Sequence, residues 1–317
     1  MGSQTHQPPQ IPVIDLSLED LKPGSASWLP TCNQIRHALE EYGCFVAKYD
    51  QLSPQLSTKL FSQSKDLFEL PVETKKQNTS DEPYRGYIGP TKYMPLYEST
   101  AIDKATVLEE VHKFMNLMWP DGKDQFCEVV DSYAKLLGAL NELTVEMLFE
   151  SYGLRKHFPS LAASNSHLLR FLKYKQPQDT ETTTIRFAAH TDINFATIVH
   201  QYDIGGLEVQ AKDGTWISVE PQPSHFLIFA GQGMQVWSND RIKACYHRVK
   251  VSAGNGERYS MGLFTFNNGV IQVPEELVDD KHPLLYKPFD SRGYIRFYIS
   301  SDEAVKLNNP IKAFCGA

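Results

Sequence analysis

The chain has 317 residues, 41% of them hydrophobic, enough to bury the core of one large domain or two small ones. Its 31 basic and 38 acidic residues give a net charge of −7, which excludes a general attraction for nucleic acid or an anionic membrane. The five cysteines are scattered without a Cys-x-x-Cys pair, which fits a reducing compartment. Because there is also no membrane-length apolar run and no signal-peptide core, we expect a cytoplasmic protein.

The first half of the chain has the periodicity of helices. Ser53-Pro54 has the features of a helix start, and apolar residues then recur at helical spacing until Leu70-Pro71. A second, longer apolar stripe follows Asp121-Gly122 and ends near Gly153. We expect this long helix to back a sheet.

From His167 onward the pattern changes to short β runs with turn signals between them. Lys212-Asp213-Gly214 is a hairpin signal. Many short, closely spaced strands predict a sandwich or barrel, and a jelly roll is a member of that class. A short helix is expected within Ser300 to Phe314. The expected strands are 167–174, 184–189, 195–201, 206–211, 215–219, 225–230, 236–238, 246–252 and 259–266.

These patterns divide the chain into three regions. Residues 1–165 form a mainly helical support with an opening strand, 166–270 form the jelly-roll core, and 271–317 form an extension that packs near the site. The expected fold is therefore mainly β with supporting helices: a helical N-terminal half, a double-stranded β-helix core and a C-terminal helix.

His190 and Asp192, with the distant His247, are the candidate metal ligands. They have the residue types and order of a two-histidine, one-carboxylate site for non-haem Fe(II). His190 and Asp192 are two residues apart, so on a strand both side chains point to the same side. His-x-Asp also occurs by chance, and a lone histidine is more often a core or surface residue. Three ligands on one face would leave positions for a substrate and O2.

A second signature strengthens the metal hypothesis. Arg258 and Ser260 share one face at the start of the expected strand that follows His247. A guanidinium and a hydroxyl at the floor of an apolar barrel suit one end of a dicarboxylate. Arg258 alone would more simply be a surface residue paired with a carboxylate.

The ordered motifs resemble the plant-type soluble 2-oxoglutarate- and Fe(II)-dependent dioxygenases over nearly the whole chain. The motifs that carry the resemblance are Ile11-Pro-Val-Ile-Asp-Leu16, Tyr42-Gly-Cys-Phe45, Leu70-Pro71, Tyr84-Arg-Gly-Tyr87, His190-Thr-Asp192, Gly205-Gly-Leu-Glu-Val209, Trp216-Ile217, Trp237-Ser-Asn239, His247-Arg-Val249, Arg258-Tyr-Ser260, Pro274-Glu-Glu-Leu-Val-Asp279, His282-Pro283 and Tyr286-Lys-Pro-Phe289.

By this resemblance His190, Asp192 and His247 hold the iron, and Arg258 and Ser260 bind the distal carboxylate of 2-oxoglutarate. The family usually adds a tyrosine from an Asn-x-Tyr-Pro strand. The resemblance therefore implies Tyr174 as a further residue of the co-substrate site, although Leu172 and Lys175 replace the Asn and Pro. Two other departures are Lys48-Tyr49-Asp50 in place of Asn-His-Gly and Gly231-Gln232 in place of Gly-Asp.

Within the family, the 173–175 strand and the 190–201 run resemble a specialised-metabolism branch. That branch includes enzymes that convert glucosinolate side chains to alkenyl or hydroxyalkyl forms, and steroidal alkaloid hydroxylases. The resemblance implies hydroxylation, desaturation or dealkylation of a small metabolite, coupled to conversion of 2-oxoglutarate and O2 to succinate and CO2. We also expect the protein to be a monomer and its activity to be supported by ascorbate. Phe264 and Tyr87 are candidates for substrate packing, with ordinary core positions as the alternative.

Three alternatives remain at this stage. The first is an iron oxidase of the same fold that takes electrons from ascorbate. The second is a zinc hydrolase with the same ligands, although no His-Glu-x-x-His element is present. The third is a non-catalytic small-molecule binder with a relic site.

Overall fold

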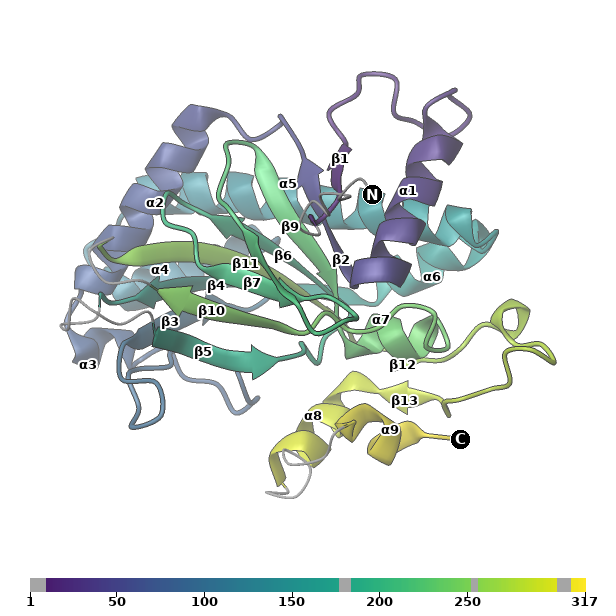
Figure 1. Ribbon diagram of the computed structural model, residues 1–317. Coiled ribbons are helices and arrows are strands. Elements are labelled where there is room, and N and C mark those ends of the chain that lie inside the picture. The colour runs from purple at the N-terminus through teal and green to yellow at the C-terminus, as the bar shows by residue number, and fades with distance from the viewer. Residues whose placement is uncertain (1–9, 177–183, 252–255, 301–308) are drawn as a thin grey trace, which may run out of the picture.

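The computed structural model describes residues 10–176, 184–251, 256–300 and 309–317. Two sheets form the centre of the molecule (Figure 1). The major sheet has seven strands in the order β1-β2-β9-β6-β11-β4-β3, and the minor sheet has four in the order β5-β10-β7-β8. Except for the parallel pair β1–β2, all pairings within these sheets are antiparallel. The predicted jelly-roll core with supporting helices is confirmed.

The N-terminal region contributes helices and three strands of the major sheet. The helix expected after Ser53 is α2, and the Ser53 hydroxyl accepts a hydrogen bond from the backbone N–H of Leu56 at 3.1 Å. The elements of this region are β1 (Val13–Asp15), α1 (Trp28–Tyr42), β2 (Cys44–Lys48), α2 (Pro54–Glu69), α3 (Val72–Lys75), β3 (Tyr97–Ile102), α4 (Leu108–Met118), α5 (Asp124–Ser151), the 3-10 turn η1 (Arg155–His157) and α6 (Phe158–Ala163).

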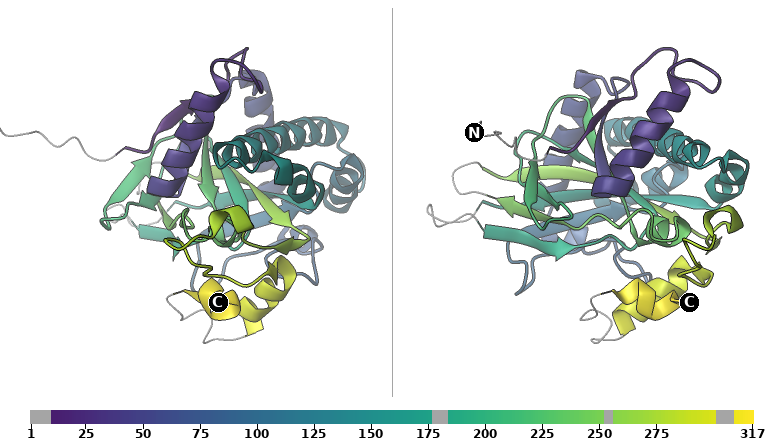
Figure 2. Two further views of the ribbon diagram at one scale, coloured as in Figure 1. Left: turned by 90° about the vertical axis from the view of Figure 1, so that its right-hand side faces the viewer. Right: turned by 45° about the vertical axis from the view of Figure 1, so that its right-hand side comes forward.

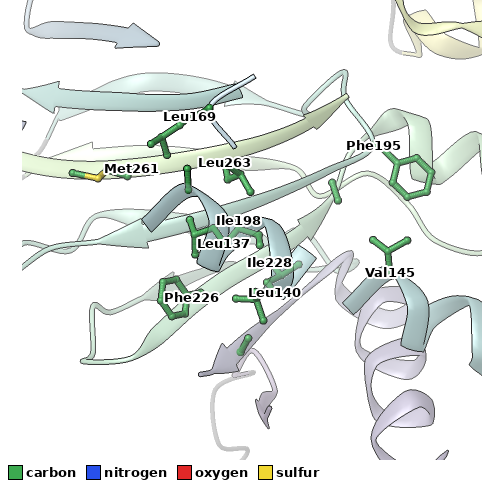
Figure 3. Close-up of a cluster of buried hydrophobic side chains, with 14 of the residues drawn as sticks. Leu137, Leu140, Val145, Leu169, Phe195, Ile198, Phe226, Ile228, Met261 and Leu263 are labelled. Carbon is green, nitrogen blue, oxygen red and sulfur yellow. The ribbon is translucent and has the colours of Figure 1, made fainter. Parts of the chain in front are cut away.

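The long helix α5 backs the major sheet, as its apolar stripe predicts. Leu137 and Leu140 of this helix are fully buried, and Figure 3 shows them beside side chains of the sheet such as Ile198 and Ile228. Burying a leucine side chain stabilises a fold by roughly 1.5–3 kcal/mol. This packing fixes the back of the sheet, so its other face is free to form a site.

The core region supplies the strands that carry the candidate residues. Strand β11 pairs with β4 on one side and β6 on the other, in continuous antiparallel register. The elements are β4 (Asn165–Tyr174), β5 (Thr184–His190), β6 (Ala196–Gln201), β7 (Leu207–Gln210), β8 (Trp216–Val219), β9 (His225–Ala230), α7 (Gln232–Trp237), β10 (His247–Val251) and β11 (Arg258–Asn267).

The strand expected at 236–238 is wrong, because this segment belongs to the end of α7 and the turn after it. The Gln235 N–H donates to the carbonyl of Gly231, which closes a helical turn. All six residues of α7 are buried, including Gln232 and Gln235, so the segment has no alternation of exposed and buried positions that could distinguish a strand from a buried helix.

The C-terminal region lies on the side of the sheets away from α1 (Figure 2). A short helix was expected within Ser300 to Phe314. Residues 301–308 of this segment lie outside the described residues, Ser300 ends α8, and α9 begins at Pro310. None of the helices within the described ranges is long and apolar enough to cross a membrane. The elements are β12 (Val270–Ile271), η2 (Glu275–Leu277), β13 (Phe289–Asp290), α8 (Ser291–Ser300) and α9 (Pro310–Cys315).

Candidate metal and co-substrate site

The fold brings His190, Asp192 and His247 together. His190 ends β5, His247 begins β10, and the two residues are paired in the minor sheet. One donor atom from each of the three side chains lies within 4.8 Å of the others. The Asp192 Oδ1 atom is 3.5 Å from His190 Nε2 and 3.9 Å from His247 Nε2. Donor atoms bonded to one metal at about 2.0–2.2 Å must lie this close together, so the cluster fits a metal ion.

Both histidines are oriented by their own backbone. His190 Nδ1 lies 2.9 Å from the carbonyl of Ala188, and His247 Nδ1 lies 3.1 Å from the carbonyl of Cys245. Because a carbonyl only accepts, each Nδ1 is the donor and each Nε2 carries the free lone pair. This is the tautomer that a metal ligand needs. Burial, followed by the neighbouring His190, lowers the pKa of His247 to about 4, so its imidazole is neutral at pH 7.

The carboxylate of Asp192 is positioned by residues of the next strand. Thr197 Oγ1 donates to Asp192 Oδ2 at 2.5 Å and accepts from the side-chain amide of Asn194 at 3.1 Å. Burial alone would raise the pKa of Asp192, but the imidazoles of His190 and His247 beside it, together with the hydrogen bond from Thr197, hold the pKa below its usual value. Asp192 is therefore an anion, as ferrous iron binding requires.

Arg258 and Ser260 form a second polar cluster in the same cavity. Arg258 Nη1 donates to Ser260 Oγ at 3.0 Å, and Nη2 donates to Gln201 Oε1 at 2.8 Å. The Arg258 guanidinium lies 4.9 Å from the centre of the Tyr174 ring, which is buried beside it. Arg258, Ser260 and Tyr174, which the family resemblance associates with 2-oxoglutarate, thus lie together. Gln201 also belongs to this cluster, and nothing in its sequence position at the end of a strand indicated this.

The buried charge of Arg258 has no anionic partner among the described residues. The side chain is 1% exposed, and its hydrogen bonds go to neutral oxygens. Burial lowers its pKa, which reflects the cost of placing a cation there. A carboxylate from a ligand would offset this cost, which fits one end of a dicarboxylate such as 2-oxoglutarate.

The glycine pair at 205–206 lets the backbone approach Arg258. Arg258 Nε donates to the carbonyl of Gly205 at 3.1 Å. Gly206 has a φ of +120°, and a Cβ atom there would lie 1.9 Å from the carbonyl oxygen of Lys250. Only glycine fits such a position.

Both clusters open on one cavity of about 410 Å3 between the two sheets. Phe264 lines this cavity, as does Tyr174. Tyr87 is not among its lining residues; its hydroxyl instead donates to Glu98 at 2.9 Å. Ile295 and Tyr298 of α8 also line the cavity, and these two residues of the C-terminal extension were not among the sequence candidates.

Other residues that resembled ligands lie elsewhere. His200 is buried in the core, with Nδ1 3.1 Å from the Tyr133 hydroxyl, and His225 contacts the carbonyl of Pro223. Neither belongs to the metal cluster of the described residues. The thiol of Cys245 is also outside that cluster, although its carbonyl orients His247.

Comparisons with known proteins agree with this geometry. Residues 165–267 match the 2OG-Fe(II) oxygenase superfamily, and residues 11–117 match the family described as non-haem dioxygenase in morphine synthesis N-terminal. The chain is 40% identical over 296 residues to the probable 2-oxoglutarate-dependent dioxygenase AOP1.2 of Arabidopsis thaliana, with 91% of each chain covered. A double-stranded β-helix with a His-Asp-His cluster and a buried Arg-x-Ser pair defines the class of Fe(II)- and 2-oxoglutarate-dependent dioxygenases.

Solved structures are similar over most of the chain. The rice dioxygenase for auxin oxidation superposes with a TM-score of 0.81 at 28% identity, covering 97% of this chain and all of that one. The 2-oxoglutarate complex of dioxygenase for auxin oxidation 1 from Arabidopsis thaliana gives 0.78 at 28% identity, covering 86% and 100%. The protein belongs to the 2OG-Fe(II) oxygenase superfamily and is an Fe(II)- and 2-oxoglutarate-dependent dioxygenase that uses O2.

Proposed function

We propose that the enzyme oxidises a small organic molecule of plant specialised metabolism, by hydroxylation or by the related desaturation or dealkylation. The observation that carries the proposal is that the metal cluster and the Arg258–Ser260 pair open on one cavity. Its volume of about 410 Å3 is in the range of small-molecule sites. The solved relatives named for auxin oxidation support a small organic substrate, since they are similar in sequence and fold.

In this proposal each polar residue has a separate task. His190, Asp192 and His247 hold Fe(II) through Nε2, Oδ1 and Nε2, while Arg258 and Ser260 bind the distal carboxylate of 2-oxoglutarate beside Tyr174. When bound, iron and 2-oxoglutarate supply the oxidising chemistry, with release of succinate and CO2. The apolar lining, including Phe264, excludes water and orients the substrate.

The proposal also assigns a role to each of the three regions of the chain. Residues 1–165 support the core of 166–270, and 271–317 close the cavity through α8. We also propose that the enzyme acts as a monomer in the cytoplasm, with ascorbate supporting activity. The five cysteines, all free and buried, support a reducing compartment.

Succinate release tests the proposed activity before the substrate is identified. The iron-loaded protein is incubated with 2-oxoglutarate, O2 and fractions of a plant metabolite extract, with Asp192→Ala as the matched control. We expect at least one fraction to raise succinate release by the wild-type enzyme and none to do so with the variant. Equal release by both proteins, or no fraction that raises release, would contradict the proposal.

A further inference from the structure

Arg170 is a second buried arginine that faces the cavity. It belongs to β4, where Leu168, Arg170 and Leu172 alternate onto the lining face. The residue is only 5% exposed. Three of the described residues that line the cavity are ionisable as Asp or Arg: Asp192, Arg170 and Arg258. The proposed function gives a role to Asp192 and to Arg258, but none to Arg170.

The buried lysines Lys75 and Lys173 have carboxylate partners, and Arg170 does not. Lys75 lies 2.5 Å from Glu98, and Lys173 lies 2.9 Å from Glu257. Arg170 makes hydrogen bonds to neutral oxygens and no ion pair with a described carboxylate. A buried cation without a compensating charge is costly, and Arg258 has the same property at the position proposed to bind a carboxylate.

The guanidinium of Arg170 also retains donor capacity. Nη1 donates to Ser99 Oγ at 2.8 Å and more weakly to the Gly86 carbonyl at 3.5 Å, and Nη2 donates to the Tyr84 carbonyl. A guanidinium has five N–H donors, so these bonds fix its position without using all of them. The loop that contains Tyr84 is thereby attached to the same side chain that faces the cavity.

Strand register separates Arg170 from the co-substrate cluster. Arg170 is paired with Gly262 on β11, whereas Arg258 is paired with Tyr174. Four residues of a strand span about 13 Å along the backbone, so the two arginines project from well-separated positions along the cavity. Thr197, which holds Asp192, is paired with Phe264, only two positions along β11 from Gly262. Arg170 is therefore near the metal side of the cavity.

An apolar surface lies directly beside Arg170. A Cβ atom at Gly262 would be 2.7 Å from the Phe264 ring, so this ring lies over the glycine that is opposite Arg170. Leu168 and Leu172 flank Arg170 on its own strand and also line the cavity. A cation held by neutral hydrogen bonds and flanked by apolar side chains suits a ligand with one anionic group on an apolar body.

We propose that the oxidised substrate is a small, largely apolar carboxylic acid whose carboxylate is bound by Arg170. This inference rests on the proposed function, since it assigns the substrate class of that same site. Arg170 would hold the carboxylate end, and the apolar remainder would lie along Phe264 toward the metal. The position of the charge would thus decide which carbon is oxidised.

Matched acids and amides test the inference on the iron-loaded enzyme with 2-oxoglutarate under anaerobic conditions. The probes are phenylacetate against phenylacetamide and 4-phenylbutanoate against 4-phenylbutanamide. Their binding is followed by the change in the visible band of the iron–2-oxoglutarate chelate. We expect at least one acid to bind about 10- to 100-fold more tightly than its amide and to shift the band without abolishing it.

Variants on β4 separate recognition from structural support. Arg170→Gln should reduce the acid-to-amide ratio to about one, and Arg170→Lys should retain part of the preference because it keeps the positive charge. Lys173→Gln removes a positive charge from the same strand outside the cavity and should keep the full ratio. A purely structural role for Arg170 would weaken acids and amides equally and leave the ratio unchanged.

The outcomes distinguish the two proposals. Failure of the band to form in the wild-type enzyme would contradict the proposed function itself. If the band forms, the inference about Arg170 is overturned by equal binding of acids and amides, by no binding of either, or by acids that act only by displacing 2-oxoglutarate. It is also overturned if Arg170→Gln keeps the preference for acids.

Discussion

Thr197 Oγ1 donates a hydrogen bond of 2.5 Å to Oδ2 of Asp192, which leaves Oδ1 as the oxygen nearer the two histidines. The threonine belongs to the major sheet, whereas His190 and His247 belong to the minor sheet. This bond therefore couples the carboxylate of the metal cluster to the sheet opposite the histidines. It makes the geometry of the cluster depend on both sheets together.

Replacing Thr197 with valine should weaken Fe(II) binding by about 10- to 100-fold, because the carboxylate loses the donor that fixes its orientation. The measurement is an anaerobic Fe(II) titration. Thr58→Val changes an exposed threonine of α2 and is the matched control. An unchanged Fe(II) affinity in Thr197→Val would show that the bond does not position the ligand.

His190→Ala and Asp192→Ala should each lower Fe(II) affinity by more than about 100-fold, a larger effect than loss of a residue that only orients a ligand. The unfolding midpoint measured in a metal chelator should change little, because the cluster lies at the edge of a cavity rather than in the packed core. His225→Ala removes a histidine outside the cluster and should bind iron normally. Normal iron-dependent turnover in either ligand variant would remove the metal assignment.

Arg258→Gln should raise the 2-oxoglutarate concentration needed for half-saturation by about 10- to 100-fold, since a charge-assisted pair is lost. Arg248→Gln provides a control, because Arg248 is paired with Glu208 at 2.6 Å and does not line the cavity. The comparison is made by titrating 2-oxoglutarate into each iron-loaded protein. An unchanged requirement in Arg258→Gln would place the carboxylate elsewhere.

Acid should destabilise the protein partly through His200. Burial lowers the pKa of His200 to about 4 in the fold, compared with about 6.5 in an unfolded chain. Between these two pH values the unfolded state binds more protons at His200 than the folded state does. The contribution of His200 to the free energy of unfolding is therefore fully present above pH 6.5 and decreases as the pH falls. The loss approaches about 1.4 kcal/mol for each pH unit between pH 6.5 and the folded-state pKa of about 4.

Urea unfolding at pH 7.5 and 5.5, in a metal chelator, measures this contribution. His200→Gln should lose about 1 kcal/mol less stability than the wild-type protein between the two pH values. The same loss in both proteins would contradict the pKa assigned to His200.

The sequence was most informative where functional residue types occur at the spacing of side chains on one face of a β-strand. Arg258 and Ser260 could be predicted as a pair because their two-residue spacing places both side chains on one face of β11. His190 and Asp192 could be predicted from their residue types and order, although β5 ends at His190 and Asp192 follows the strand. The core strands and the α5 stripe followed from apolar periodicity. The single helical turn of α7 could not be recognised, because a fully buried run has no periodic contrast.

The remaining residues of the site could not be predicted from the sequence, because their roles depend on contacts between segments that are far apart in the chain. Gln201 and Thr197 become relevant only when β6 is placed beside β11, and α8 lines the cavity only through the packing of the C-terminal region. Tyr87 was a candidate because it lies in an aromatic cluster, yet its hydrogen bond to Glu98 depends on how the loop folds against β3. Arg170 had one visible signal, a charge within the apolar run from Leu168 to Leu172.

The most direct test is formation of the iron–2-oxoglutarate chelate in the absence of O2. Fe(II) and then 2-oxoglutarate are added to the purified protein, and the visible metal-to-ligand charge-transfer band is recorded. We predict that the band appears with the wild-type protein, and that Arg258→Gln forms it only at a higher 2-oxoglutarate concentration. Absence of the band from wild-type protein that demonstrably binds Fe(II) would contradict the account.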